Sequence, residues 1–140
     1  MSPRGNRKAG RRRLVDMSAP QETFWQPDLL PIEDVQYVAL LDENTKIIQK
    51  LGYNERDELT DWAVVQQCRR DGAWCTVGLY DNCHYKGVHR HLYNRYGQQF
   101  DEYLIMAVTS YDDVGLGLDT VLGWLDSNWL ENERRSNRGY

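Results

Sequence analysis

The sequence lacks any long apolar run, and no stretch approaches the roughly 18 residues that a membrane-spanning helix requires. We therefore expect no membrane partner. The basic N-terminus has no apolar segment behind it, which is not typical of a secretory signal. Cysteine is scarce too: the three residues are an odd number without metal-ligand spacing. We expect the protein in the reducing cytoplasm.

Phenylalanine is also rare, with two residues against five tryptophans and nine tyrosines. Aromatic side chains with polar tips are typical of β-rich chains with amphipathic surfaces. A chain of 140 residues that is 41% hydrophobic can bury a core without disulfides or metal. We expect a basic arm and an extended strap over residues 1–34, followed by a single domain over residues 35–140.

Acidic residues are absent from residues 1–13, which hold six basic ones: Arg4, Arg7, Lys8, Arg11, Arg12 and Arg13. The other 11 basic residues accompany all 21 acids, so residues 14–140 carry a net charge of −10. We predict that the arm binds nucleic acid, because each cation that contacts a phosphate releases a counterion. The alternatives are a solvated tail and an arm that folds back on the acidic body.

Three prolines in residues 14–34 exclude a long helix. We expect an extended strap there, with four apolar anchors: Phe24, Trp25, Leu29 and Leu30. Apolar, β-branched runs joined by turn formers then predict three hairpins, at 35–53, 62–81 and 88–109. Asp71-Gly72 suits a two-residue turn, which pairs Cys68 with Cys75. We expect the two thiols to stay reduced, with a disulfide as the alternative.

The hydrophobic period changes near residue 113. An amphipathic helix over 113–135 is predicted, with Asp112 or Asp113 as its cap and a frayed end at SNRGY. Its stripe comprises Leu118, Val121, Leu122, Leu125 and Trp129. The sheet residues expected to meet it are Val64, Cys75, Val77, Leu79, Leu104 and Met106. The fold class is α+β: a curved antiparallel meander of about six strands with one C-terminal helix packed on a face.

All three histidines fall in YDNCHYKGVHRHLYNRYG, residues 80–97. Alternate residues of a strand share a face, so His89, His91 and Tyr93 project together, and Arg90 points the other way. A glycine-containing turn allows His84 to fold back over the pair. A solvated strand face also accounts for this pattern, without any function.

Two chemistries suit these residues. Three imidazoles, with Asp81 orienting one of them, fit an open zinc site, although the spacing is not diagnostic. Metal-free cleavage of RNA instead needs a base, an acid and a cation for the crowded phosphorane. We favour cleavage, with no cofactor and no metal. The candidate residues are His84, His89, His91, Arg90 and Asp81 for catalysis, and Arg95 and Tyr93, together with the arm, for contact with RNA.

The run from GAWCTVGLYDNCHYKGVHRHLYNRYG through GLDTVLGWLDSNWLENERR resembles an uncharacterised family of short bacterial, archaeal and phage proteins. In these proteins a Tyr-Asp hairpin end and a histidine precede an HRH-like strand and a closing helix. The centre is also similar to TumE-type toxins of toxin–antitoxin modules, on Tyr80, Asp81, Asn82, His84, His89 and His91. Leu79 stands where an arginine is expected. The resemblance implies a toxin-like protein that acts on RNA and is held by an antitoxin.

The competing hypothesis is a non-catalytic phage or accessory protein that binds a host protein. Its binding surface would be acidic and aromatic, in keeping with the charge of residues 14–140 and the five tryptophans. The sequence contains no specific catalytic motif that excludes it. Both hypotheses remain open at this point.

Overall fold

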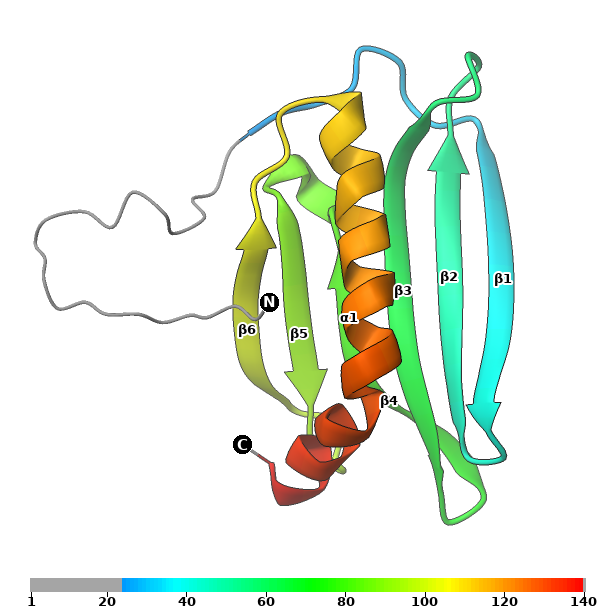
Figure 1. Ribbon diagram of the computed structural model, residues 1–140, viewed down its shortest axis with the longest axis vertical. Helices are drawn as coiled ribbons and strands as arrows, with labels where there is room; N and C mark the ends of the chain where they lie inside the picture. The colour runs from blue at the N-terminus through cyan, green and yellow to red at the C-terminus, as the bar shows by residue number, and fades with distance from the viewer. Residues whose placement is uncertain (1–23, 140) are drawn as a thin grey trace, which may run out of the picture.

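The computed structural model describes residues 24–139 and, of His84, only the backbone. One sheet holds six strands in chain order, each antiparallel to its neighbour. The strands are β1 (Glu33–Asp42), β2 (Thr45–Tyr53), β3 (Leu59–Arg70), β4 (Ala73–Asp81), β5 (Val88–Tyr93) and β6 (Gln99–Met106). A 3-10 turn, η1 (Cys83–Tyr85), joins β4 to β5, and helix α1 (Tyr111–Arg138) lies across one face (Figure 1). The predicted α+β meander with one C-terminal helix is confirmed.

Within residues 24–139, no helix has both the length and the apolar character needed to cross a bilayer.

The start of α1 is fixed by Ser110, not by an aspartate. The Ser110 hydroxyl accepts a hydrogen bond from the Asp113 backbone N–H at 3.2 Å, which satisfies a free donor of the first turn. Asp113 instead accepts from the backbone N–H of Thr109 at 2.9 Å. The predicted cap at Asp112 or Asp113 is therefore wrong, and the helix begins earlier, at Tyr111. Its end is closed by Gly139, whose φ of 86° lets its N–H reach Arg135.

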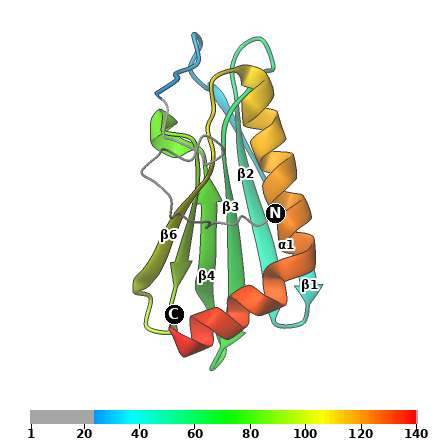
Figure 2. The same cartoon turned by 60° about the vertical axis from the view of Figure 1, so that its left-hand side comes forward.

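The core lies between α1 and the middle of the sheet. The helix packs on β3, β4 and β5 (Figure 2). Close approach depends on Gly117, where an added Cβ would lie 2.7 Å from a methyl group of Val88 and 3.3 Å from the Trp62 ring. The buried residues from the helix and the sheet include Val114, Leu118, Val121, Leu125, Trp62, Val64 and Val88.

The β3–β4 hairpin follows the sequence prediction at its turn. Asp71 and Gly72 adopt φ values of 52° and 82°, the left-handed conformation that a type I′ turn requires at both positions. Cys68 lies opposite Cys75, as predicted. Both thiols are free, so the expected reduced pair is confirmed and the disulfide alternative is wrong.

Further along the same hairpin, a bulge changes which residues face the helix. The register shifts so that Val77 has no direct partner on β3, and the following residues exchange faces. Tyr80 is fully buried beneath α1, whereas Leu79 pairs with Val65 on the other face. Leu104 pairs with His89 and also lies on that other face. The prediction that Leu79 and Leu104 pack on the helix is wrong.

The strap is anchored by fewer side chains than predicted. Trp25 packs against the core and makes an edge-on contact with Tyr111, with ring centroids 5.2 Å apart. Pro27 is buried. Phe24 and Leu30 are 75% and 55% exposed, so these two are not anchors.

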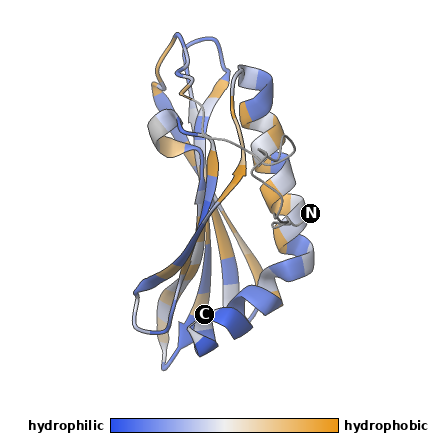
Figure 3. Cartoon of the chain, turned by 90° about the vertical axis from the view of Figure 1, so that its left-hand side faces the viewer, coloured by the Kyte–Doolittle hydropathy of each residue, from blue (hydrophilic) through white to orange (hydrophobic). Residues whose placement is uncertain are grey.

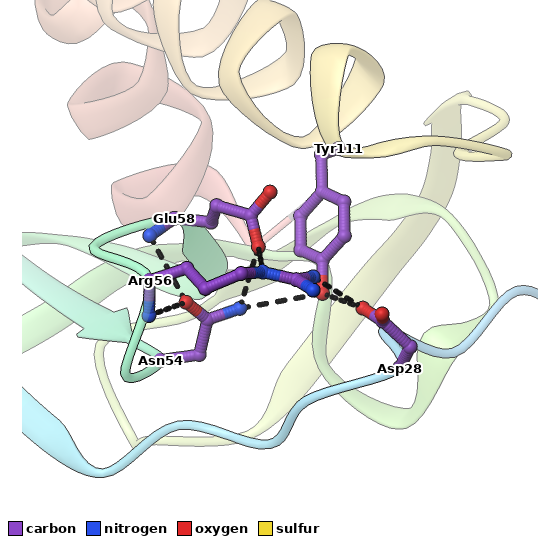
Figure 4. A network of polar contacts seen from close by, with 5 residues as sticks. All are labelled: Asp28, Asn54, Arg56, Glu58 and Tyr111. Atoms are coloured by element: carbon purple, nitrogen blue, oxygen red, sulfur yellow. Dashed lines mark hydrogen bonds and ion pairs between the residues drawn. The ribbon is translucent and has the colours of Figure 1, made fainter.

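A polar network ties the strap to the rest of the molecule (Figure 4). A carboxylate oxygen of Asp28 accepts hydrogen bonds from the Tyr111 hydroxyl at 2.5 Å and from Arg56 at 2.8 Å. Arg56 also contacts Glu58, and the buried Asn54 side chain accepts from the backbone N–H groups of both. Hydrogen bonds from Tyr111 and Arg56 lower the pKa of Asp28. The network joins the strap, the β2–β3 loop and the first turn of α1.

Candidate functional site

The face of the sheet turned away from α1 is not covered by the helix, and the short turn η1 lies beside one end of it (Figure 3). We call it the open face. Directly paired residues of antiparallel strands share a face, so the register identifies its rows. The two central rows read, from β1 to β6, Gln36, Lys50, Ala63, Asp81, His89 and Leu104, and then Val38, Ile48, Val65, Leu79, His91 and Glu102.

The open face brings two of the predicted catalytic histidines together. His89 pairs with Asp81 on β4, and His91 lies two residues along β5. The imidazole centroids are 6.3 Å apart and the ring planes meet at 28°. Tyr93 lies further along the same strand, near the β5–β6 turn. Four predicted site residues therefore share one surface.

The orientation of His91 is set by its neighbours on β6. Its Nδ1 lies 3.0 Å from the side-chain oxygen of Gln99, whose amide nitrogen lies 3.5 Å from a carboxylate oxygen of Glu102. An amide nitrogen donates to the carboxylate, so the amide oxygen faces the imidazole and accepts from Nδ1. In the neutral imidazole, Nε2 of His91 is then the nitrogen with a lone pair.

Arg90 does not join the histidines. It lies on the helix-covered face, where its guanidinium contacts Asp101 at 2.6 Å and lies near the rings of Tyr103 and Trp124. The guanidinium is thus held in a partly buried contact, away from the open face. His84 belongs to η1, and its side chain lies outside the described part of the chain, as do the six basic residues of the arm.

Beside the histidines, an open hollow extends toward the β5–β6 turn. Its lining residues are Lys50, Val65, Cys75, Thr76, Leu79, Tyr93, Asn94, Arg95, Tyr96 and Gly97. Nearby, the Trp74 ring is held between Lys46 and Arg69, whose cationic groups lie 4.3 and 4.6 Å from its centroid. This end of the open face is basic and aromatic.

The opposite end of the open face is acidic: Asp34 and Asp61 line a second shallow hollow, and Asp81 pairs with Ala63, which lines it too. Burial, together with Asp81 and Asp61, raises the pKa of Cys83 to about 12. Its thiol therefore stays protonated and is not a nucleophile. Burial, then Asp81 and Glu102, also raise the pKa of Tyr93, which keeps its hydroxyl as a hydrogen-bond donor. The two histidines lie where the basic and acidic ends meet.

No cluster of three or more metal-ligating side chains exists among the residues that the structure describes. The hollow and the clamped tryptophan were not predicted from the sequence. The Asp71-Gly72 turn does place Arg69 opposite Trp74, but Lys46 reaches the ring from β2. Alternation within one hairpin cannot reveal a contact that a third strand completes.

The chain matches no protein-family model, no curated protein and no solved structure. Similarity to the TumE-type toxins thus rests on the motif residues alone. A proposal for the function must therefore be argued from the arrangement of side chains on the open face.

Proposed function

We propose that the protein acts on RNA and cleaves it without a metal, using His89 and His91 as an acid–base pair. The observation that carries the proposal is the position of the two imidazoles, 6.3 Å apart on the sheet face that α1 does not cover. At that spacing both imidazoles can reach the same phosphodiester when it lies over their exposed edges. Both rings lie at the border of a basic, aromatic region, so a bound strand can reach them.

The hollow near the β5–β6 turn supplies the binding surface. Tyr96 is 78% exposed and Tyr93 lies beside it, so both rings are available to stack on unpaired bases. Arg95 and Lys50 in the same hollow attract the phosphate backbone. Stacking combined with backbone attraction is the usual way to hold a single strand with little sequence preference.

The proposed reaction is a transesterification within the RNA. His91, whose Nε2 keeps its lone pair, takes the proton of the 2′-hydroxyl as that oxygen attacks phosphorus. The bond from phosphorus to the 5′-oxygen breaks, and protonated His89 gives a proton to the leaving oxygen. The products are a 2′,3′-cyclic phosphate and a 5′-hydroxyl. DNA is not a substrate, because it has no 2′-hydroxyl.

A cleavage assay with end-labelled single-stranded RNA in EDTA tests this proposal. We expect wild type to leave cyclic phosphate ends, and His89→Ala and His91→Ala each to slow cleavage by about 10²–10⁴-fold. Gln36→Ala, on the same open face but on β1, serves as the matched control and should cleave like wild type. Wild type that leaves RNA intact, or histidine variants as fast as the control, would overturn the proposal.

The biological role that we propose is that of a cytoplasmic toxin restrained by an antitoxin. The reducing cytoplasm suits the three free thiols. Induced expression should then arrest growth, and the two histidine variants should relieve the arrest. If RNA is neither bound nor cleaved, the acidic, aromatic surface instead favours binding of a host protein.

A further inference from the structure

Strand β1 forms one edge of the sheet and is unusually exposed for an apolar strand. It pairs with β2 along almost all of its length, and no strand of residues 24–139 pairs with its outer side. Side chains on both of its faces are accessible: Tyr37 and Val38 are each 56% exposed, and Leu40 is 67% exposed. The outer side therefore offers a row of unpaired backbone groups flanked by apolar side chains.

The other edge, β6, lacks these properties. It is eight residues long, and its pairing with β5 shifts register twice. It also carries Asp101 and Glu102 near its centre, and most of its side chains are partly buried. Short, irregular and charged edges resist pairing with another chain. From Val35 to Leu41, by contrast, β1 has no charged residue and no proline, and its one irregularity lies at its end, beside Leu41.

We propose that β1 pairs antiparallel with β1 of a second copy of this chain, around a two-fold axis through Ala39. The proposal is independent of the action on RNA. In this register Val38 faces Leu40 of the copy on the open face, and Tyr37 faces Leu41. The two sheets join into one continuous twelve-stranded sheet with both helices on the same side. Because α1 packs on β3, β4 and β5, it does not obstruct this edge.

The sequence of β1 favours this register over the neighbouring one with its axis at Val38. With the axis at Ala39, each apolar residue from Tyr37 to Leu41 faces another apolar residue. An axis at Val38 would place Gln36 against Leu40 and Asp34 against Asp42, and like charges that face each other across strands are destabilising. Repulsion between Asp34 and Asp42 thus disfavours the register with its axis at Val38. In the register with its axis at Ala39, the apolar centre of β1 pairs with the apolar centre of the copy.

Light scattering after size exclusion, with the full chain, measures the assembly directly. We expect wild type at tens of micromolar to have twice the chain mass of 16.5 kDa. Val38→Lys and Leu40→Lys should give monomers with an unchanged circular dichroism spectrum, because both side chains are exposed in one copy. Leu116→Lys, an equally exposed leucine on α1, is the matched control and should remain a dimer. A monomeric wild type, or lysine variants that stay dimeric, overturns the proposal.

Cross-linking tests the register. Ala39→Cys places two thiols across the axis, within the range that a disulfide spans, so mild oxidation should link the copies. Gln36→Cys is the control, because its thiol has no thiol opposite and should not link above the wild-type background. Equal cross-linking of the two variants, or linking by Gln36→Cys alone, overturns the axis at Ala39.

Discussion

The N-terminal half of α1 meets the sheet through valine and leucine, whereas its C-terminal half meets it through polar side chains. Figure 3 shows this change along the helix, from mixed colours to blue. In the second half, Asn132 is 2% exposed and donates to the Tyr80 hydroxyl at 2.7 Å and to the Gln66 side chain at 3.0 Å. Ser136 is fully buried and donates to the Tyr93 backbone carbonyl.

The two halves contribute differently to the fold. Apolar burial is favourable but non-directional, so a valine–leucine stripe tolerates a small slide of the helix. Buried hydrogen bonds are directional, and a polar group left unpaired costs about 1–3 kcal/mol. The first half therefore supplies most of the free energy of docking, and the second half fixes the position of the helix along the sheet.

The largest loss of stability is expected from a substitution in the core that the apolar half of α1 covers. Trp62→Ala should lower the free energy of unfolding by about 3–5 kcal/mol, because it leaves a cavity under the helix. It also removes the hydrogen bond from the indole N–H to the Val114 carbonyl at 2.9 Å. Urea denaturation measures the loss. Trp62→Phe keeps most of the volume and should cost clearly less; equal losses would mean that volume does not matter here.

A substitution in the polar half of α1 should have the second-largest effect on stability. Asn132→Ala should cost about 2–3 kcal/mol, since it strips partners from Gln66 and Tyr80 in a buried setting. Asn137→Ala changes an exposed asparagine on the same helix and should leave stability within about 0.5 kcal/mol of wild type. The same urea titration compares them. If both variants unfold at the same urea concentration, the network does not fix the helix.

Tyr80→Phe removes only a hydroxyl and should cost about 1 kcal/mol at neutral pH. Burial raises the pKa of Tyr80 from 10.0 to about 12. The unfolded chain therefore loses this proton first, and stability should fall as pH rises through that interval. Unfolding followed between neutral and alkaline pH should show this decline in wild type and a weaker one in the variant. If wild type and Tyr80→Phe lost stability in parallel as pH rises, the raised pKa of Tyr80 would not be the cause.

The smallest effect is expected at Glu133. Burial raises its pKa above 4.5, although the Thr45 hydroxyl that it accepts from acts in the opposite direction. The folded state thus holds this proton more tightly, so stability falls as pH rises from 4.5 through the raised pKa. Glu133→Gln keeps an acceptor for Thr45 and should flatten that part of the profile. Thermal melts across mildly acidic pH measure this dependence of stability on pH. If Glu133→Gln shows the same dependence as wild type, the carboxyl group of Glu133 is not its source.

Local patterns predicted the parts of this structure that depend on neighbours in sequence. The turn at Asp71-Gly72, the stripe from Leu118 to Leu125 and the shared face of His89 and His91 follow from fixed periods. The bulge at Val77 has no such signature, and one extra residue was enough to exchange Leu79 for Tyr80 under the helix.

The end of α1 shows the same limit. SNRGY has the composition of a frayed end, but Ser136 is held by Arg70 from β3 and by the end of β5. For the candidate site, alternation was sufficient to separate Arg90 from the histidines. It could not show that Arg90 is occupied by Asp101, or that Lys46, Arg69 and Trp74 meet.

The order of the strands has a consequence for how the chain folds. Every strand pairs only with its neighbours in the sequence, so each hairpin can form as soon as its two strands exist. Helix α1 follows all six strands, yet it supplies the cover for Trp62 and Val64 on β3. During synthesis the meander is therefore complete while its apolar face is still bare. Docking of the helix is the late, long-range step, and the sheet is most prone to aggregation just before it.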